Sequence, residues 1–188
     1  MTHLRSAYGL GAAVLVLLGL AAAPAGAEPS DPWVRAWGLN SAGQLGNGST
    51  LDQQTPSAVS GLSRDDVREL ATGGGSNDRN NAVALLQDGT GQSWGGNNKG
   101  QLGDGSTVKR TTPVPVPALT GVSSLAGGYA LSFAVLDDQS VLAWGDNASG
   151  QLGDGTTTAS SSPVVALPPG SGTGRVPALL PWKSSYAY

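Results

Sequence analysis

The sequence contains no cysteine and a single histidine, His3. Without cysteine the fold cannot rely on disulfides, so apolar burial and backbone pairing must hold it together. Residues 28–188 contain neither histidine nor cysteine, which excludes Ser-His-Asp and Cys-His catalysis and the usual zinc and copper ligand sets from that part of the chain. We therefore expect no metal and no cofactor.

Charged residues are also scarce, at 12% of the chain, with 13 acidic against 10 basic side chains. Nucleic acid and anionic lipid both require clustered lysine and arginine, so neither is expected as a partner. Adjacent carboxylates occur as Asp65-Asp66 and Asp137-Asp138. Neighbouring residues point in different directions, so neither pair supplies the opposed acid and base of a glycoside hydrolase. The sequence therefore predicts a protein that is not an enzyme.

The N-terminus has the pattern of an export signal. Arg5 lies in a short polar start, an apolar run follows from Leu10 to Ala23, and Ala25-Gly26-Ala27 matches the small-x-small site of signal peptidase. Cleavage before Glu28 assigns residues 1–27 to a signal peptide and predicts a secreted, extracellular protein that no membrane holds once the signal is removed. The alternative is an uncleaved N-terminal anchor, for which the apolar run is short.

Most of the remaining chain is a repeat built on three Trp-Gly pairs, each followed at the same spacing by Gly-Gln-Leu-Gly. Pro56, Pro113 and Pro163 are separated by the same numbers of residues as the three tryptophans. We expect the tryptophans to pack between units rather than to stack against a sugar. We expect the glycine-rich stretches to form structural turns, each with a buried leucine, rather than phosphate-binding or calcium-binding loops. The repeated positions are Trp37, Gly38, Gly43, Gln44, Leu45, Gly46, Trp94, Gly95, Gly100, Gln101, Leu102, Gly103, Trp144, Gly145, Gly150, Gln151, Leu152 and Gly153.

A second half-pattern precedes only the later two tryptophans. A Leu-Ala stretch ending in Gly-Gly is followed by an apolar run, at 70–86 and again at 125–136. The runs read as short antiparallel strands. Asp88-Gly89 predicts a two-residue hairpin turn after the first run, whereas Asp138-Gln139 lacks the glycine and is expected to form a looser or different turn. Residues 112–116 contain two prolines, which confine any strand there to an edge.

The order of these motifs resembles the regulator of chromosome condensation repeat family over roughly Trp33 to Val165. The resemblance implies an all-β fold, a β-propeller of four-stranded antiparallel blades. Family repeats commonly place a histidine shortly after the Gly-Gly pair, where this sequence has Asn81 and Leu131.

Three units are too few to close a ring, which takes about four to eight blades. The sequence thus predicts a partial β-propeller of about three blades in an incomplete ring. A truncated product is favoured, and an open array or a ring assembled from several chains stays open. The expected organisation is a propeller region at 28–168, with units at about 33–59, 60–116 and 117–165, and an irregular tail at 169–188.

Candidate ligand-binding residues lie where the repeats differ in length, because loops that depart from the repeat do not serve its packing. The alternative is that these are merely tolerated insertions. The candidates are Arg64, Asp65 and Asp66 in one loop and Asn77, Asp78, Arg79 and Asn80 in another.

The function expected from these observations is that of a non-enzymatic extracellular binding or structural module, with a protein or glycan bound through the propeller loops and possible self-association through open blade faces. Two alternatives stay open. The founding member of the resembled family exchanges nucleotide on a small GTPase and binds chromatin, although export and the low basic content argue against that role here. A truncated fragment with no independent function is the other.

Overall fold

The computed structural model describes residues 34–63, 66–75 and 77–170. The predicted signal peptide, Arg64, Asp65 and the tail beyond residue 170 lie outside these residues. Within them the chain is all-β apart from a single 3-10 turn, η1, at Asn77–Arg79. The strands are β1 Arg35–Gly38, β2 Gln53–Ala58, β3 Val67–Gly73, β4 Asn81–Leu86, β5 Gly91–Gly95, β6 Arg110–Pro115, β7 Val122–Gly128, β8 Leu131–Leu136, β9 Val141–Gly145 and β10 Ser160–Leu167.

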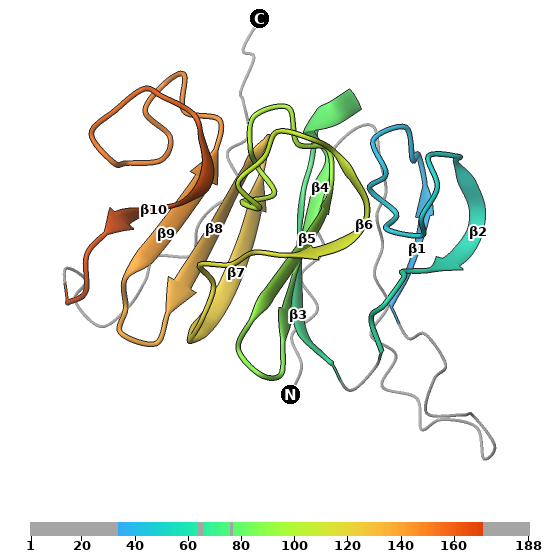
Figure 1. Cartoon of the computed structure of the whole chain (residues 1–188), viewed down its shortest axis with the longest axis horizontal. Coiled ribbons are helices and arrows are strands. Elements are labelled where there is room, and N and C mark those ends of the chain that lie inside the picture. Colours follow the sequence, from blue (N-terminus) through green and yellow to red (C-terminus); the bar gives the residue numbers. More distant parts are fainter. Residues whose placement is uncertain (1–33, 64–65, 76, 171–188) are drawn as a thin grey trace, which may run out of the picture.

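The strands form three antiparallel sheets that follow one another along the chain (Figure 1). Among the described residues, two sheets have four strands, in the order β3-β4-β5-β6 and β7-β8-β9-β10, and the sheet at the N-terminal side has β1 and β2. Strands β1, β5 and β9 each carry the Trp-Gly pair. The first sheet is therefore the second half of a blade, and the ring is open, as the repeat count predicts.

The hydrophobic core lies between the sheets rather than within one of them. One cluster joins Val34, Leu45 and Val59 of the first sheet and its loops to Ala82 and Trp94 of the second. A corresponding cluster joins the second sheet to Trp144 of the third. Each sheet thus needs its neighbour to bury an apolar face, which is the physical basis of stability in repeat folds.

The two ends of the blades carry different connections between strands. The end that we call the loop end carries η1, the β7–β8 turn and the Gly-Gln-Leu-Gly loops that follow β1, β5 and β9; the opposite end, the turn end, carries the tight β4–β5 and β8–β9 turns (Figure 1). Strand β6 is an edge strand and pairs irregularly with β5, as its prolines predict. Among the described residues no helix has the length and apolarity needed to cross a membrane.

The expectation of a looser turn at Asp138-Gln139 is wrong. Gly89 and Gln139 both adopt positive φ, at 81° and 70°. The closing hydrogen bonds also match, with 2.8 Å from Leu86 N to Thr90 O and 2.9 Å from Leu136 N to Ser140 O. An aspartate side chain that accepts from the residue two positions later stabilises both turns, so Gln139 is held in a conformation that suits glycine.

Candidate functional site

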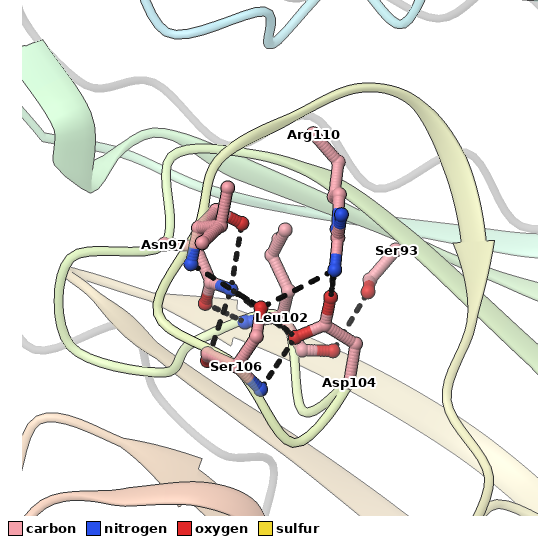
Figure 2. Close-up of polar contacts among 7 residues, drawn as sticks. Ser93, Asn97, Leu102, Asp104, Ser106 and Arg110 are labelled. Carbon is pink, nitrogen blue, oxygen red and sulfur yellow. Dashed lines mark hydrogen bonds and ion pairs between the residues drawn. The ribbon is translucent and has the colours of Figure 1, made fainter.

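The Gly-Gln-Leu-Gly loop of the second unit is organised by one buried amide, that of Asn97 (Figure 2). Its Nδ2 donates to the carbonyls of Ser106 and Val108 at 3.1 and 3.0 Å, and to Asp104 Oδ1 at 3.2 Å. Its Oδ1 accepts from Leu102 N at 3.0 Å. The loop is therefore closed upon its own backbone.

The same position holds asparagine in all three units, as Asn40, Asn97 and Asn147. Asn40 and Asn147 bind the equivalent leucine N–H groups at 3.0 and 2.9 Å. These asparagines are not among the residues predicted from the sequence, although their constant position three residues after each tryptophan is the signal that marks them.

Asp104 takes part in this structural network. Its carboxylate accepts from Ser106 and forms an ion pair with Arg110 at 2.7 Å (Figure 2). Partial burial raises the pKa of Asp104, but the hydrogen bonds from Ser106 and Arg110 outweigh burial and hold the pKa below its usual value of 3.8. Within the described ranges no group of three or more His, Cys, Asp or Glu side chains is placed to hold a metal ion.

The repeated tryptophans lie between sheets. Trp94 and Trp144 are both 0% exposed, so neither offers a ring face to a sugar. The indole of Trp94 donates to the carbonyl of Gln44 at 3.1 Å, and that of Trp144 to the carbonyl of Gln101 at 2.9 Å. Trp37 is only half-buried, because no earlier sheet covers it in the described part of the chain.

The second interface has an additional polar chain. Asn81, at the position where the family commonly has histidine, donates to Ser132 Oγ at 2.9 Å, and Ser132 Oγ donates to the carbonyl of Gln101 at 2.9 Å. That carbonyl thus accepts from both Ser132 and Trp144. The position of Ser132 is taken by Ala82 in the preceding unit, so the first interface lacks this link.

The side-chain amide of the repeated glutamine finds its acceptor in the inserted segment at residues 77–80. Gln101 Nε2 donates to the carbonyl of Asp78 at 2.9 Å. Gln44 Nε2 is buried and has no partner among the described residues. The first sheet has no segment in the described part of the chain that corresponds to residues 77–80, so the acceptor is missing.

The two candidate binding loops lie at opposite ends of the blades. Asp66 is at the turn end, where its carboxylate accepts from Ser63 N and Oγ at 3.0 and 2.6 Å and its carbonyl accepts from Gln87 N. The segment of η1 is at the loop end. The structure therefore does not bring Asp66 together with Asp78 and Arg79.

At the loop end, residues 77–80 divide between surface and interior. The side chain of Asp78 is exposed, and the Arg79 guanidinium lies 4.8 Å from the centroid of the Tyr129 ring. Asn80 is only 5% exposed, and its carbonyl accepts from Gly96 N. Asn77 begins the 3-10 turn. Asn80 therefore supports the loop rather than presenting a side chain to a ligand.

Tyr129 is not among the site residues predicted from the sequence. It lies in the β7–β8 turn, is 48% exposed and stacks with an arginine from the preceding blade. No repeat pattern marks it, because it occupies the short turn that replaces the 77–80 insertion. The half-buried Arg79 and the exposed Tyr129 together form a pair that spans two blades.

Comparison with known proteins places these features in a family. The family model of the regulator of chromosome condensation (RCC1) repeat matches residues 34–77 and 89–135. The ultraviolet-B receptor UVR8 of Arabidopsis thaliana is 33% identical over 89 residues, which are 47% of this chain and 19% of the receptor. Human Protein RCC2 is 39% identical over 83 residues, 44% of this chain and 14% of that protein. The human E3 ubiquitin-protein ligase HERC2 is 37% identical over 103 residues, 54% of this chain and 2% of the ligase.

Solved structures with the same fold agree. Prp20p of Saccharomyces cerevisiae, described with its binding to Gsp1p and histones, has a TM-score of 0.61 at 20% identity and covers 71% of this chain. Yeast RCC1 (Prp20) bound to Kap60 has a TM-score of 0.58 at 26% identity and covers 73% of this chain. The matched part is 34% and 32% of those two chains, so this chain corresponds to about a third of such a propeller.

Proposed function

Since the chain is an RCC1-repeat protein with the propeller fold of that family, we propose that it is a non-enzymatic module that binds a protein partner through the loop end of its blades. Solved relatives of this fold bind proteins, namely Gsp1p, histones and Kap60. Because the chain spans about a third of those structures, we extend protein binding to it but not the particular partners of those proteins.

The observation that carries the proposal is the surface pair of half-buried Arg79 and exposed Tyr129, with the guanidinium 4.8 Å from the ring centroid. Arginine and tyrosine are enriched in the central residues of protein interfaces. The pair joins two blades, so both side chains are held by folded structure and lose little conformational freedom on binding. The exposed carboxylate of Asp78 lies beside them in sequence.

A protein partner fits this surface better than a glycan. Sugar recognition by stacking requires an open aromatic face, and the repeated Trp94 and Trp144 are fully buried. Tyr129 is exposed, but the Arg79 guanidinium stacks on one face of its ring. A protein surface can instead use the hydroxyl and ring edge of Tyr129 together with the charge of Arg79.

Site-specific photo-crosslinking tests the proposal. A photoreactive amino acid is placed at Tyr129 in the full chain, and a control variant carries it at Gln87, an exposed residue at the turn end. Adducts that form only at position 129 and that contain peptide by mass spectrometry support protein binding at the loop end. Carbohydrate adducts, or equal labelling at both positions, contradict it.

A second candidate is a regulator of a small GTPase, favoured by the matches to Protein RCC2 and Prp20p. The two candidates differ in the compartment where the protein works. We propose the extracellular one, because of the apolar run and the small-x-small site near residue 27. N-terminal sequencing of the protein from its natural source decides: a chain that starts at Glu28 supports export, and one that retains residues 1–27 favours the regulator.

A further inference from the structure

Two hydrogen bonds join the first sheet to the outer strands, β5 and β6, of the second sheet. Trp94 on β5 donates to the carbonyl of Gln44 at 3.1 Å. At the start of β6, the carbonyl of Thr111 accepts from Gly48 N at 2.9 Å. The receiving groups, Gln44 and Gly48, both belong to the loop that follows β1.

The interface between the second and third sheets repeats this arrangement. Trp144 on β9 donates to the carbonyl of Gln101 at 2.9 Å. The carbonyl of Ser161 on β10 accepts from Gly105 N, also at 2.9 Å. In both interfaces the incoming partner is therefore the pair of outer strands, with one indole donor and one carbonyl acceptor.

At the end of the third sheet, no strand of a further sheet among the described residues packs against the receiving loop. Gln151 is exposed, whereas Gln44 and Gln101 are buried. A Cβ atom placed on Gly103 would lie 2.7 Å from the Trp144 indole nitrogen, but one on Gly153 would find its nearest neighbour, Ala166, at 3.7 Å. In the part of the chain that the structure describes, no side chain fills the space beside Gly153 and Ala166 that an indole fills in the earlier interfaces.

The first sheet carries the matching incoming half. Strands β1 and β2 correspond to β5 and β6, with Trp37 at the position of Trp94 and Gln54 at that of Thr111. Trp37 is half-buried and Gln54 is exposed, and neither makes the equivalent bond within the described residues. The first and third sheets therefore carry the two halves of one interface, the incoming half on β1 and β2 and the receiving half on the loop after β9.

We propose that the open end of the third sheet binds the β1–β2 end of a second copy of this chain. Trp37 of one copy donates to the carbonyl of Gln151 of the other, and Gly155 N donates to the carbonyl of Gln54. The described first sheet has no counterparts of the inner strands β3 and β4, so this interface is smaller than the internal ones, and association depends on protein concentration. Because the two halves differ, the contact is head-to-tail and generates a ring or a filament.

Sedimentation velocity of the full-length chain over a range of concentrations tests this proposal, with circular dichroism to show that each variant is folded. Trp37→Ala removes the incoming indole, and Ala166→Arg fills the receiving space with a charge. The control is Val165→Arg, at a position that is 53% exposed and whose equivalent in the second sheet, Pro115, stays exposed beside a formed interface.

The wild-type chain and Val165→Arg are expected to form oligomers that grow with concentration. Each of the other two variants is expected to associate at least about tenfold more weakly, the usual loss when a central interface residue is removed. An equimolar mixture of Trp37→Ala and Ala166→Arg should give a dimer and nothing larger, since each variant retains one intact end. A monomeric wild type, variants that associate like the wild type, weaker association of Val165→Arg, or a mixture without dimer would each overturn the proposal.

Discussion

The indole N–H of Trp94 donates a 3.1 Å hydrogen bond to the main-chain carbonyl of Gln44, which lies 50 residues earlier in the chain. The bond crosses from one sheet to the preceding one, and the ring is fully buried against residues of both. A single side chain therefore belongs to the packing of two repeat units at once.

Replacing Trp94 with alanine should cost about 3–5 kcal/mol in the free energy of unfolding, the range for deleting a buried aromatic side chain. Trp37→Ala should cost less, because Trp37 is only half-buried and has no sheet before it in the described part of the chain. Urea unfolding of the two variants measures the difference. Equal losses, or a larger loss at Trp37, at a concentration where the protein is monomeric would refute the arrangement of consecutive blades; the same result only at high concentration would show that another chain covers the N-terminal unit.

Phenylalanine substitutions separate the hydrogen bond from the packing. Trp94→Phe leaves the buried carbonyl of Gln44 without its donor, whereas after Trp144→Phe the carbonyl of Gln101 still accepts from Ser132 Oγ. An unpaired buried acceptor costs about 1–3 kcal/mol, so Trp94→Phe should destabilise the protein more. In the double variant Trp144→Phe with Ser132→Ala the carbonyl of Gln101 also loses its second donor, so the additional cost of the phenylalanine change should approach that of Trp94→Phe. If Trp144→Phe alone is as destabilising as Trp94→Phe, the Ser132 bond contributes nothing.

The turn at Gln139 offers a stabilising change. Gln139 has a φ of 70°, and this left-handed backbone conformation costs a residue with a side chain about 1–2 kcal/mol of free energy. Gln139→Gly removes this strain but increases the freedom of the unfolded chain, so a gain of about 0.5–1 kcal/mol is expected in chemical unfolding. Gly89→Gln, at the equivalent turn, should lower stability by a similar amount. A neutral or destabilising Gln139→Gly would show that the glutamine side chain has a role in the turn.

Protonation of Asp104 in acid should lower the stability of the protein, because Asp104 holds the loop of the second unit together. Hydrogen bonds from Ser106 and Arg110 hold the pKa of Asp104 below its usual value of 3.8. A carboxyl group with a lowered pKa in the folded state stabilises the fold above its unfolded pKa, and this contribution disappears as pH falls through the folded pKa. Asp104→Asn, which copies the residue found at Asn47 in the first unit, should therefore reduce stability at pH 7 and lose less on acidification. Urea midpoints at about pH 7 and pH 3, on either side of the usual aspartate pKa, test this. Parallel pH profiles for the two proteins would contradict the role of Asp104.

Much of the fold follows from the sequence because its periodic residues have one structural role each. The Trp-Gly spacing predicts β1, β5 and β9, and the apolar runs predict their partner strands. The prolines of β6 place it at an edge, where the missing N–H groups are tolerated. These are local consequences of backbone chemistry, so they need no knowledge of the tertiary structure.

The candidate surface was less accessible to sequence reasoning. The length differences between repeats pointed to Arg79, but equally to Asp66, which the fold places at the other end of the blades. Tyr129 meets Arg79 only because consecutive blades bring the β7–β8 turn beside η1. Such a contact between residues 50 positions apart in sequence depends on the offset between blades, which no local pattern reports. Gln139 was misjudged because the aspartate two residues before Ser140 can stabilise the turn without glycine.

The acceptor for each buried tryptophan is a main-chain carbonyl, which every amino acid provides. A unit duplicated in register would therefore be accepted by its neighbour whatever side chain stood at the receiving position, provided that the loop kept its shape. Such a contact lets repeat number change by duplication or loss without a compensating substitution in the adjoining unit. Lineages of these proteins are thus expected to vary in the number of their units more readily than in the tryptophan that joins them.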